Sequence, residues 1–418
     1  MKNNVKNIVT SVVFIVFIFG IALVCWFKPA GEMSFSERRK LEQFPEFSVG
    51  AYVTDAKGNT EFKVLDKIAN DKPSSLTVYD NSIREYIDKF ESYSLDQFPL
   101  RDTMRSLKAF FDLKIFNKMD NNDMYEVDGY ISQMQPTLVV ESNAGKNIYG
   151  VNHATGVWNN IYNKYLDGKA NKVLVSVIPD KNYYMAKENG YLAYDYEELF
   201  ALIKEKCPDF EYVDISGELS KESFYKTDTH WSQDKIVDVA KKIAAALGVY
   251  DEYDWSGYDS DNIKSLDLPF YGVYAGQLNL GTESETIKYF TNNVLDNCKL
   301  FEYESNKYTD IYNESLAKAN LEVGKDPYDF FLSGAKKGIM RIDNPNQDNG
   351  KTLVIFRDSF GSSFAPLMAE GYSTVYVVDI RVTMAGMINM IVGGFEDKDV
   401  LFLASSMVIN DSSEFNVN

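Results

Sequence analysis

The stretch that decides the fold is Thr352-Leu353-Val354-Ile355-Phe356-Arg357-Asp358-Ser359-Phe360-Gly361. Its first half is a run of apolar and β-branched residues, which predicts a strand buried on both faces. The polar residues after it predict a sharp turn into a helix. Open parallel sheets bind ligands beyond the carboxyl ends of their strands, so a serine at this turn would point its hydroxyl into a crevice. Asp358 or Ser359 could instead simply cap the helix.

The same alternation of strand and helix continues on both sides of that stretch. The other apolar runs that predict strands are Val173–Ile178, Phe210–Ile215, Thr374–Val378 and Val400–Ala404. Between them, residues 233–247 carry an apolar stripe at helical spacing, and Ser232 is the expected N-cap. Strands of this kind separated by helices predict an α/β fold with a doubly wound parallel sheet.

The amino-terminal run Ile8–Phe27 is uncharged and long enough to cross the hydrocarbon core of a bilayer, roughly 30 Å thick. It ends in bulky residues rather than the small ones of a signal-peptide cleavage site, which predicts an uncleaved anchor. The flanking basic residues do not decide its orientation. They are Lys2 and Lys6 before the run, and Lys28, Arg38, Arg39 and Lys40 after it.

These signals divide the chain into three parts. We expect residues 1–30 to form a short tail and the transmembrane anchor; the cytoplasmic location of the tail is implied by a family resemblance and not by the charges. Residues 31–120 read as a mostly helical stalk, broken at the proline of Asp96–Asp102. Residues 121–418 form the α/β domain. An irregular insertion at about 249–350, rich in Asp, Asn and Tyr, could be a lid, a small subdomain or an acceptor-binding flap.

Charge and cysteine content narrow the classes of partner. The chain has 61 acidic and 43 basic residues, a net charge of −18. This balance argues against nucleic acid or anionic lipid as the main partner and is compatible with a neutral glycan. Outside the anchor there are two cysteines, Cys207 and Cys298, so no disulfide framework holds the fold. They could form one bridge or remain two thiols.

A second polar segment, Tyr225-Lys226-Thr227-Asp228-Thr229-His230-Trp231-Ser232, lies just before a predicted helix. A serine hydroxyl is a poor nucleophile unless a base takes its proton, and imidazole suits that task at neutral pH. Asp228 could hold the tautomer of His230. The chain has only one other histidine, His153, which has no carboxylate nearby and reads as structural. We therefore take Ser359, His230 and Asp228 as a candidate triad.

Aspartates at strand ends offer a different chemistry. They are Asp180, Asp214, Asp358 and Asp379. Together they could hold a divalent cation through hard oxygen ligands. Aspartates in such places also cap the helices that follow them, so the triad is the preferred hypothesis and no metal is expected.

The Asp-Thr-His-Trp-Ser and Arg-Asp-Ser-Phe segments, in that order, resemble the DHHW protein family of Gram-positive bacteria. More distantly, they resemble the SGNH-like proteins of alginate O-acetylation. Shorter matches run along nearly the whole chain. They are Ser36–Arg39 with Phe44-Pro45, Asp96–Asp102, Val177–Lys181, Tyr328–Phe331 and Val378–Arg381.

The resemblance implies an extracytoplasmic SGNH-like fold that transfers acetyl groups to a cell-surface or secreted polysaccharide without a cofactor. It implies a membrane-bound O-acyltransferase as the partner that supplies the acetyl group. Ser359 is then the nucleophile, His230 the base and Asp228 the acid that orients it.

Three departures from the family pattern bear on this transfer. Arg357 stands where SGNH enzymes usually have glycine, and Thr229 replaces the first histidine of the family's name. The separate Gly and Asn that complete the oxyanion site cannot be located. As oxyanion donors we expect the backbone amide of Ser359, helped by Gly361 or Ser362. A carbohydrate acetylesterase and a non-catalytic glycan-binding or assembly protein remain the alternatives.

Overall fold

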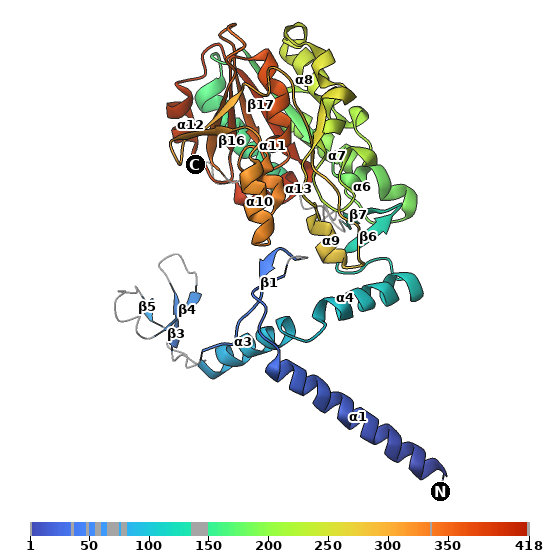
Figure 1. The fold of residues 1–418 in the computed structure, drawn as a ribbon. Coiled ribbons are helices and arrows are strands. Elements are labelled where there is room, and N and C mark those ends of the chain that lie inside the picture. Colours follow the sequence, from blue (N-terminus) through green and yellow to red (C-terminus); the bar gives the residue numbers. More distant parts are fainter. Residues whose placement is uncertain are drawn as a thin grey trace. The chain divides into compact units, whose positions relative to one another are not determined.

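The computed structural model describes residues 2–34, 37–46, 50–54, 60–64, 75–76, 82–134, 149–334 and 337–415. The chain separates into two compact units, Met1–Lys108 and Ala109–Asn418 (Figure 1). We describe each unit by itself.

The first unit begins with α1 (Lys2–Phe27). Within the described residues it is the one helix that is long and apolar enough to cross a membrane, over Val5–Cys25. The elements that follow are β1 (Met33–Ser34), β2 (Arg39–Lys40), β3 (Gly50–Thr54), β4 (Thr60–Val64), β5 (Ser75–Leu76), α3 (Ser82–Asp96) and α4 (Arg101–Phe110). Among the described residues of 31–120, the expected helical character is found in α3, in α4 and in the short π-helix Phe111–Ile115 that follows α4. Helices α3 and α4 flank the predicted break at Pro99. The short strands before them were not predicted.

The second unit is built on an eight-stranded sheet with the order β13-β12-β14-β16-β15-β17-β8-β9. From β16 to β9 neighbouring strands are parallel. These five are β8 (Lys172–Ile178), β9 (Glu211–Tyr212), β15 (Thr352–Arg357), β16 (Thr374–Asp379) and β17 (Asp399–Ser405). Each coincides with a predicted apolar run, although β9 covers only two residues of its run.

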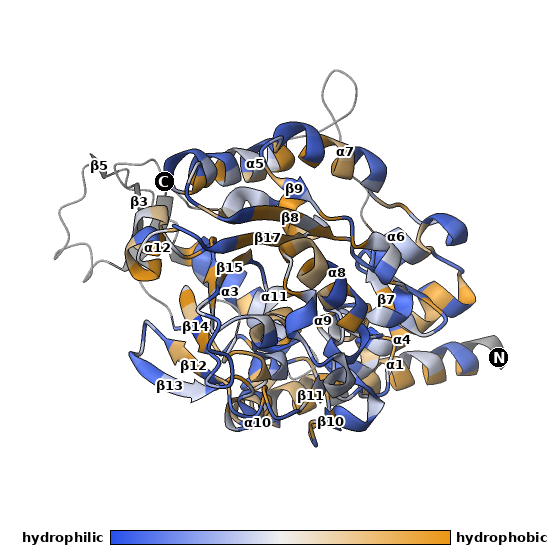
Figure 2. Ribbon diagram, turned by 90° about the horizontal axis from the view of Figure 1, so that it is seen from above, coloured by the Kyte–Doolittle hydropathy of each residue, from blue (hydrophilic) through white to orange (hydrophobic). Residues whose placement is uncertain are grey.

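The sheet is covered on both faces, as the near-continuous apolar strands require. One face packs on α5 (Tyr149–Ile161), α7 (Tyr196–Lys206) and α12 (Ala385–Val392). The other packs on α8 (Val237–Leu247) and α11 (Gly361–Phe364). Figure 2 shows α5 and α7 on one side of β8 and β17, with α8 and α11 on the other. Along β15 the side chains alternate: Leu353 and Ile355 face the α8 layer, and Val354 and Phe356 face the α5 layer.

The insertion at 249–350 does more than form a lid or flap, because three of its strands extend the central sheet. They are β12 (Lys299–Glu302), β13 (Lys307–Asp310) and β14 (Ile339–Asp343), and all are antiparallel to their neighbours. The rest of the insertion includes β10 (Ile263–Ser265), α9 (Val273–Leu278), β11 (Lys288–Phe290) and α10 (Glu314–Glu322). The remaining elements of the unit are β6 (Met124–Val127), β7 (Tyr130–Gln133), α6 (Lys181–Met185) and α13 (Ser406–Asn410).

Two local expectations are resolved by the structure. Ser232 precedes a short 3-10 helix, Gln233–Lys235, rather than α8, and its hydroxyl donates to Asp234 instead of capping a backbone amide. Cys207 and Cys298 are both buried free thiols. They lie in the hydrophobic clusters on opposite faces of the sheet, so they do not form a disulfide.

Candidate active site

The turn after β15 places Ser359 at the carboxyl edge of the sheet. The Asp358 carboxylate accepts a hydrogen bond from the Phe360 amide at 3.0 Å and another from the Ser405 amide at 2.7 Å. Because Ser405 is the last residue of β17, these bonds tie the turn to the neighbouring parallel strand. Asp358 itself is buried, whereas Ser359 remains partly exposed. The Asp358 carboxylate thus holds the turn in place, while Ser359 itself stays partly exposed.

His230 meets Ser359 across 129 residues of sequence. Its Nε2 lies 2.8 Å from the Ser359 Oγ, and its Nδ1 lies 2.6 Å from the Asp228 Oδ1. Both distances are within normal hydrogen-bond reach. Asp228 is fully buried and His230 is 7% exposed. The structure therefore brings together the three side chains singled out from the sequence, in the order carboxylate, imidazole, hydroxyl.

The Asp228 carboxylate is held by backbone donors as well as by the imidazole. Its Oδ1 also accepts from the His230 amide at 3.0 Å, and its Oδ2 accepts from the Val273 amide at 2.9 Å. Asp228 is therefore fixed in position as the acceptor for His230 Nδ1.

The insertion supplies a close backbone contact to this loop that the sequence did not reveal. A Cβ placed on Gly272 would lie 2.0 Å from the Thr227 carbonyl oxygen and 2.1 Å from its carbon. The Gly272 amide donates to Thr227 Oγ1 at 2.9 Å. Only a residue without a side chain fits between the two segments.

Glu285 fastens the same loop from the other side. Its carboxylate accepts from the amides of Lys226 and Thr227, both at 2.7 Å, and from Thr227 Oγ1 at 2.6 Å. A cleft of about 560 Å³ lies beside this contact, lined in part by Lys226, Thr227 and Glu285. Neither Ser359 nor His230 lines the cleft, so we do not assign it to the reacting atoms.

Aromatic side chains fix the plane of the His230 ring and join its loop to the serine turn. The imidazole stacks on Tyr328, with ring centroids 4.1 Å apart, and the Tyr328 hydroxyl donates to Ser363 Oγ at 2.8 Å. The Trp231 indole donates to the Phe360 carbonyl at 3.0 Å. The tryptophan that follows the histidine thus connects the two segments of the site.

Lys181 is a buried cation close to the same loop. Its Nζ donates to the carbonyl oxygens of Tyr225 at 2.8 Å and Lys226 at 3.3 Å. Burial lowers the pKa of this ammonium group to about 7, while the charge of Asp228 acts in the opposite direction. Lys181 belongs to a segment matched to the family, but its role in supporting the loop was not predicted.

Two of the amides expected as oxyanion donors form hydrogen bonds within the turn itself. The Gly361 amide donates to the Asp358 carbonyl, and the Ser362 amide donates to the Ser359 carbonyl, each at 3.1 Å. Both amides therefore bond within the first turn after the strand, and their expected role as oxyanion donors stays a prediction. Within the described residues no acceptor is found for the Ser359 amide, which remains the candidate donor.

Two of the three departures from the family pattern, Arg357 and Thr229, have side chains with partners other than Ser359. The Arg357 side chain is fully buried, with its Nη1 3.8 Å from the Asp379 carboxylate. It packs directly beneath the turn, where a Cβ on Gly361 would lie 2.5 Å from the Arg357 Cβ. The Thr229 hydroxyl is directed to the Met407 sulfur at 3.5 Å.

The remaining candidates from the sequence lie elsewhere or serve the fold. His153 Nδ1 lies 2.9 Å from the Ser412 carbonyl, a contact that ties α5 to the carboxyl-terminal region. The Asp180 carboxylate caps α6, and the Asp379 carboxylate pairs with Arg381. Asp214 accepts from the Ser216 amide at 2.9 Å. In the part of the chain that the structure describes, no three His, Cys, Asp or Glu side chains are grouped to hold a metal ion.

Comparison with family models and with curated proteins gives no match. Among solved structures, the chain is similar to a DHHW family protein from Eubacterium siraeum, with 20% identity and a TM-score of 0.54. That match covers 71% of this chain and 97% of the other. It is also similar to PatB1 of Bacillus cereus, solved with a sulfonyl adduct, with 13% identity and a TM-score of 0.50, covering 68% and 95%.

A third similar structure is the O-acetyltransferase domain of AlgJ from Pseudomonas putida, with 11% identity and a TM-score of 0.40, covering 70% and 95%. At these identities the first two likenesses show a shared fold. The α/β fold expected from the sequence is therefore confirmed, and it is shared with a DHHW family protein and with PatB1.

Proposed function

We propose that this protein is a membrane-anchored O-acetyltransferase that acetylates a cell-surface or secreted polysaccharide through Ser359. The observation that carries the proposal is the continuous contact from Asp228 through His230 to Ser359, with separations of 2.6 and 2.8 Å. Nucleophile, base and orienting acid in this relation are the signature of an activated serine. In this proposal α1 anchors the chain and the second unit works outside the cytoplasm.

The first step forms an acetyl-serine. Ser359 Oγ attacks the carbonyl carbon of the acetyl donor while His230 Nε2 takes the hydroxyl proton. The resulting imidazolium is stabilised by Asp228, and the Ser359 amide can donate to the developing oxyanion. When the bond to the leaving group breaks, His230 returns the proton to that group.

The second step passes the acetyl group to a sugar. A glycan hydroxyl gives its proton to His230 Nε2 and attacks the acetyl-serine carbonyl. Collapse of the tetrahedral intermediate releases the acetylated glycan, and the proton returns to Ser359 Oγ. Only acyl exchange and proton transfer are involved, so the scheme invokes no cofactor. The family resemblance supports the polysaccharide acceptor and a membrane-bound O-acyltransferase as the source of the acetyl group.

The proposal is tested by turnover of an activated acetyl ester by the purified full-length protein. We expect measurable release of the leaving group by the wild type and a loss of at least about 10³-fold in Ser359→Ala. Ser216→Ala is the control, because Ser216 also lies beyond the carboxyl end of a parallel strand, β9, while its hydroxyl donates to Asp214 and not to His230. Undiminished turnover in Ser359→Ala would contradict the proposal.

Hydrolysis is the close alternative, because water can replace the sugar in the second step. Addition of a neutral oligosaccharide separates the two: a transferase yields acetylated sugar, whereas an esterase yields free acetate alone.

A non-catalytic glycan-binding protein is favoured by one observation, the bonding of the Gly361 and Ser362 amides within the turn. Failure of a sulfonyl fluoride to modify Ser359, together with measurable oligosaccharide binding, would support that reading.

A further inference from the structure

Helix α3 in the first unit carries an apolar face that is exposed. Ile83, Ile87 and Phe90 lie at helical spacing, and their exposed fractions are 67%, 55% and 43%. A helix with such a stripe in a soluble domain normally buries it against a core. The opposite face carries charged and polar residues, among them Asp88 and Ser92. We call the stripe of Ile83, Ile87 and Phe90 the α3 face.

Aromatic rings gather beside the α3 face. Phe44 meets Phe90 and Tyr93 edge-to-face, with centroid separations of 6.0 and 5.3 Å, and Tyr86 stacks on Phe90 at 6.4 Å. Phe44 is itself 61% exposed, so this group does not form a closed core. Aromatic and aliphatic side chains in this combination are typical of the boundary between lipid headgroups and acyl chains.

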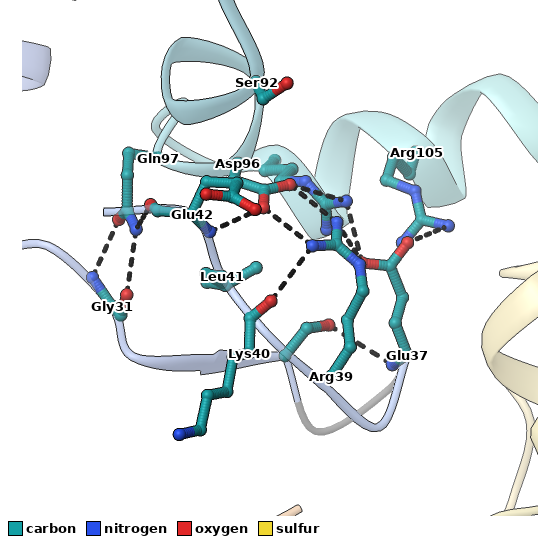
Figure 3. Close-up of polar contacts among 12 residues, drawn as sticks. Gly31, Glu37, Arg39, Lys40, Leu41, Glu42, Ser92, Asp96, Gln97 and Arg105 are labelled. Carbon is teal, nitrogen blue, oxygen red and sulfur yellow. Dashed lines mark hydrogen bonds and ion pairs between the residues drawn. The ribbon is translucent and has the colours of Figure 1, made fainter. Parts of the chain in front are cut away.

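The carboxyl-terminal end of α3 is fastened to the segment that leaves α1 (Figure 3). Gln97 Oε1 accepts from the Gly31 amide, and Gln97 Nε2 donates to the Gly31 carbonyl, both at 2.8 Å. Arg39 donates to both oxygens of Asp96 at 2.7 and 2.6 Å. We call these contacts between Gly31–Arg39 and Asp96–Gln97 the clamp.

Further ion pairs extend the clamp to α4. The Glu37 carboxylate pairs with Arg101 at 2.8 Å. It also pairs with Arg105 at 2.9 Å (Figure 3). Bidentate and networked arginine–carboxylate pairs of this kind hold a defined geometry. The clamp and these ion pairs therefore connect α3 and the start of α4 to Gly31–Arg39, the segment that follows α1.

The clamp limits how far α3 can lie from the end of α1. Helix α1 ends at Phe27, and Gly31 follows four residues later. An extended chain spans at most about 3.6 Å per residue, so Gly31 lies within about 14 Å of Phe27. Because Gln97 is hydrogen-bonded to Gly31, the carboxyl-terminal end of α3 lies within a few ångströms more than this distance from the end of α1.

We propose that the α3 face lies in the headgroup–acyl boundary of the membrane that α1 crosses. The occupant of the exposed face is lipid, because the clamp keeps α3 beside the exit of the membrane span and the face has the composition of an interfacial helix. The polar side of α3 mixes Arg84 and Lys89 with Asp88 and Glu91, so burial of apolar surface, rather than attraction to anionic lipid, supplies the binding. The inference rests on α1 being the anchor and does not depend on the chemistry of Ser359.

The test places a spin label on either side of α3 in the full-length protein, reconstituted in phosphatidylcholine nanodiscs. The variants are Ile87→Cys on the α3 face and Ser92→Cys as the matched control, about 140° around the helix. Both carry Cys25→Ser, and Cys207 and Cys298 are buried. Both labelled positions are exposed, so a label displaces no packed side chain.

Collisions with apolar oxygen and with a water-soluble nickel chelate then report the surroundings of each label. We expect the ratio of oxygen to nickel accessibility to be at least about fivefold higher at Ile87→Cys than at Ser92→Cys. Equal ratios would overturn the proposal. Dipolar broadening between labels at Ile87→Cys would assign the face to a second copy of the chain and overturn it equally.

A label on the native Cys25 separates failure of the anchor from failure of the α3 face. Lipid contact at Cys25 with water contact at Ile87→Cys overturns this inference alone. Water contact at Cys25 overturns the anchor and, with it, both the membrane part of the proposed function and this inference.

Discussion

The loop that carries His230 and the clamp after α1 both join distant segments through carboxylates, but they are built differently. In the loop, Asp228 is fully buried and each of its oxygens accepts from a backbone amide. In the clamp, Asp96 is bound mainly by the side chain of Arg39, which is 42% exposed. Acyl transfer needs its reacting atoms held within a fraction of an ångström. The proposed interfacial position of α3 requires only that the helix stay near the end of α1. Substitutions in the loop should therefore act on catalysis, and substitutions in the clamp should not.

The largest effect is expected from Asp228→Asn. The amide has the size of the carboxylate but carries no negative charge to stabilise an imidazolium, and its NH₂ group can donate to His230 Nδ1 and favour the wrong tautomer. We expect kcat to fall by about 10²- to 10⁴-fold. The free energy of unfolding should also fall, by about 1–3 kcal/mol, because the new NH₂ group must face the amide of His230 or of Val273. Ester turnover and thermal unfolding measure the two quantities. Wild-type kcat in a folded Asp228→Asn would remove the carboxylate from the mechanism.

A somewhat smaller loss is expected from Gly272→Ala. The new methyl group would lie 2.0 Å from the Thr227 carbonyl oxygen, so the Thr227–Asp228 backbone must move. A displacement of about 1 Å at a catalytic group costs about 10²-fold in rate. Gly217→Ala serves as the control, because a Cβ there meets nothing within 4 Å. Equal turnover in the two variants would show that the close approach does not position the site.

Glu285→Gln should have a moderate effect. In the wild type the amides of Lys226 and Thr227 each donate to a different carboxylate oxygen of Glu285. A glutamine side chain keeps one acceptor oxygen and would turn its NH₂ group toward the other backbone amide. We expect the free energy of unfolding to fall by about 1–3 kcal/mol and turnover by up to about tenfold. The control is Glu283→Gln, an exposed residue in the same loop. Identical unfolding curves for the two variants would contradict the fastening role of Glu285.

The smallest effect on catalysis is expected from Asp96→Asn. Ester turnover should change less than about twofold, while amide hydrogen exchange in residues 37–42 should accelerate as the clamp opens. A large loss of turnover with unchanged exchange would contradict the view that the clamp acts on local structure and only the His230 loop acts on catalysis.

Acidification should open the clamp in the wild type. Hydrogen bonds from Arg39 lower the pKa of Asp96 to about 2. Because this pKa is below the value of about 3.9 in an unfolded chain, the stabilising contribution of Asp96 is complete above pH 4. It is lost as the pH falls from about 4 through 2. The measurement is the protection of the amides of residues 37–42 against hydrogen exchange, relative to an unfolded chain at the same pH. We expect this protection to be lower near pH 2 than at pH 5.

The parallel core of the sheet could be predicted because each buried strand is a local signal. Thr352–Arg357 and Asp399–Ser405 are apolar runs whose identity does not depend on their partners. The antiparallel extension was missed because Lys299–Glu302 and Lys307–Asp310 begin and end in charged residues, as strands near a sheet edge do. Pairing between such strands is decided by tertiary contact rather than by composition.

The candidate triad could be predicted because histidine is scarce in this chain and the serine follows a buried strand. Gly272 and Glu285 could not, because their contacts to Thr227 join residues 45 and 58 positions apart and leave no local pattern. The turn bonds of Gly361 and Ser362 were not foreseen when these residues were expected as oxyanion donors. The turn uses those amides for its own hydrogen bonds.

The account rests on His230 activating Ser359, and covalent labelling tests this most directly. A sulfonyl fluoride is incubated with the wild type and with His230→Ala, and the modified residue is located by peptide mass mapping. The account predicts stoichiometric sulfonylation of Ser359 in the wild type and a rate at least about 10²-fold slower in His230→Ala. Equal labelling of Ser359 in both proteins, or none in either, would contradict it.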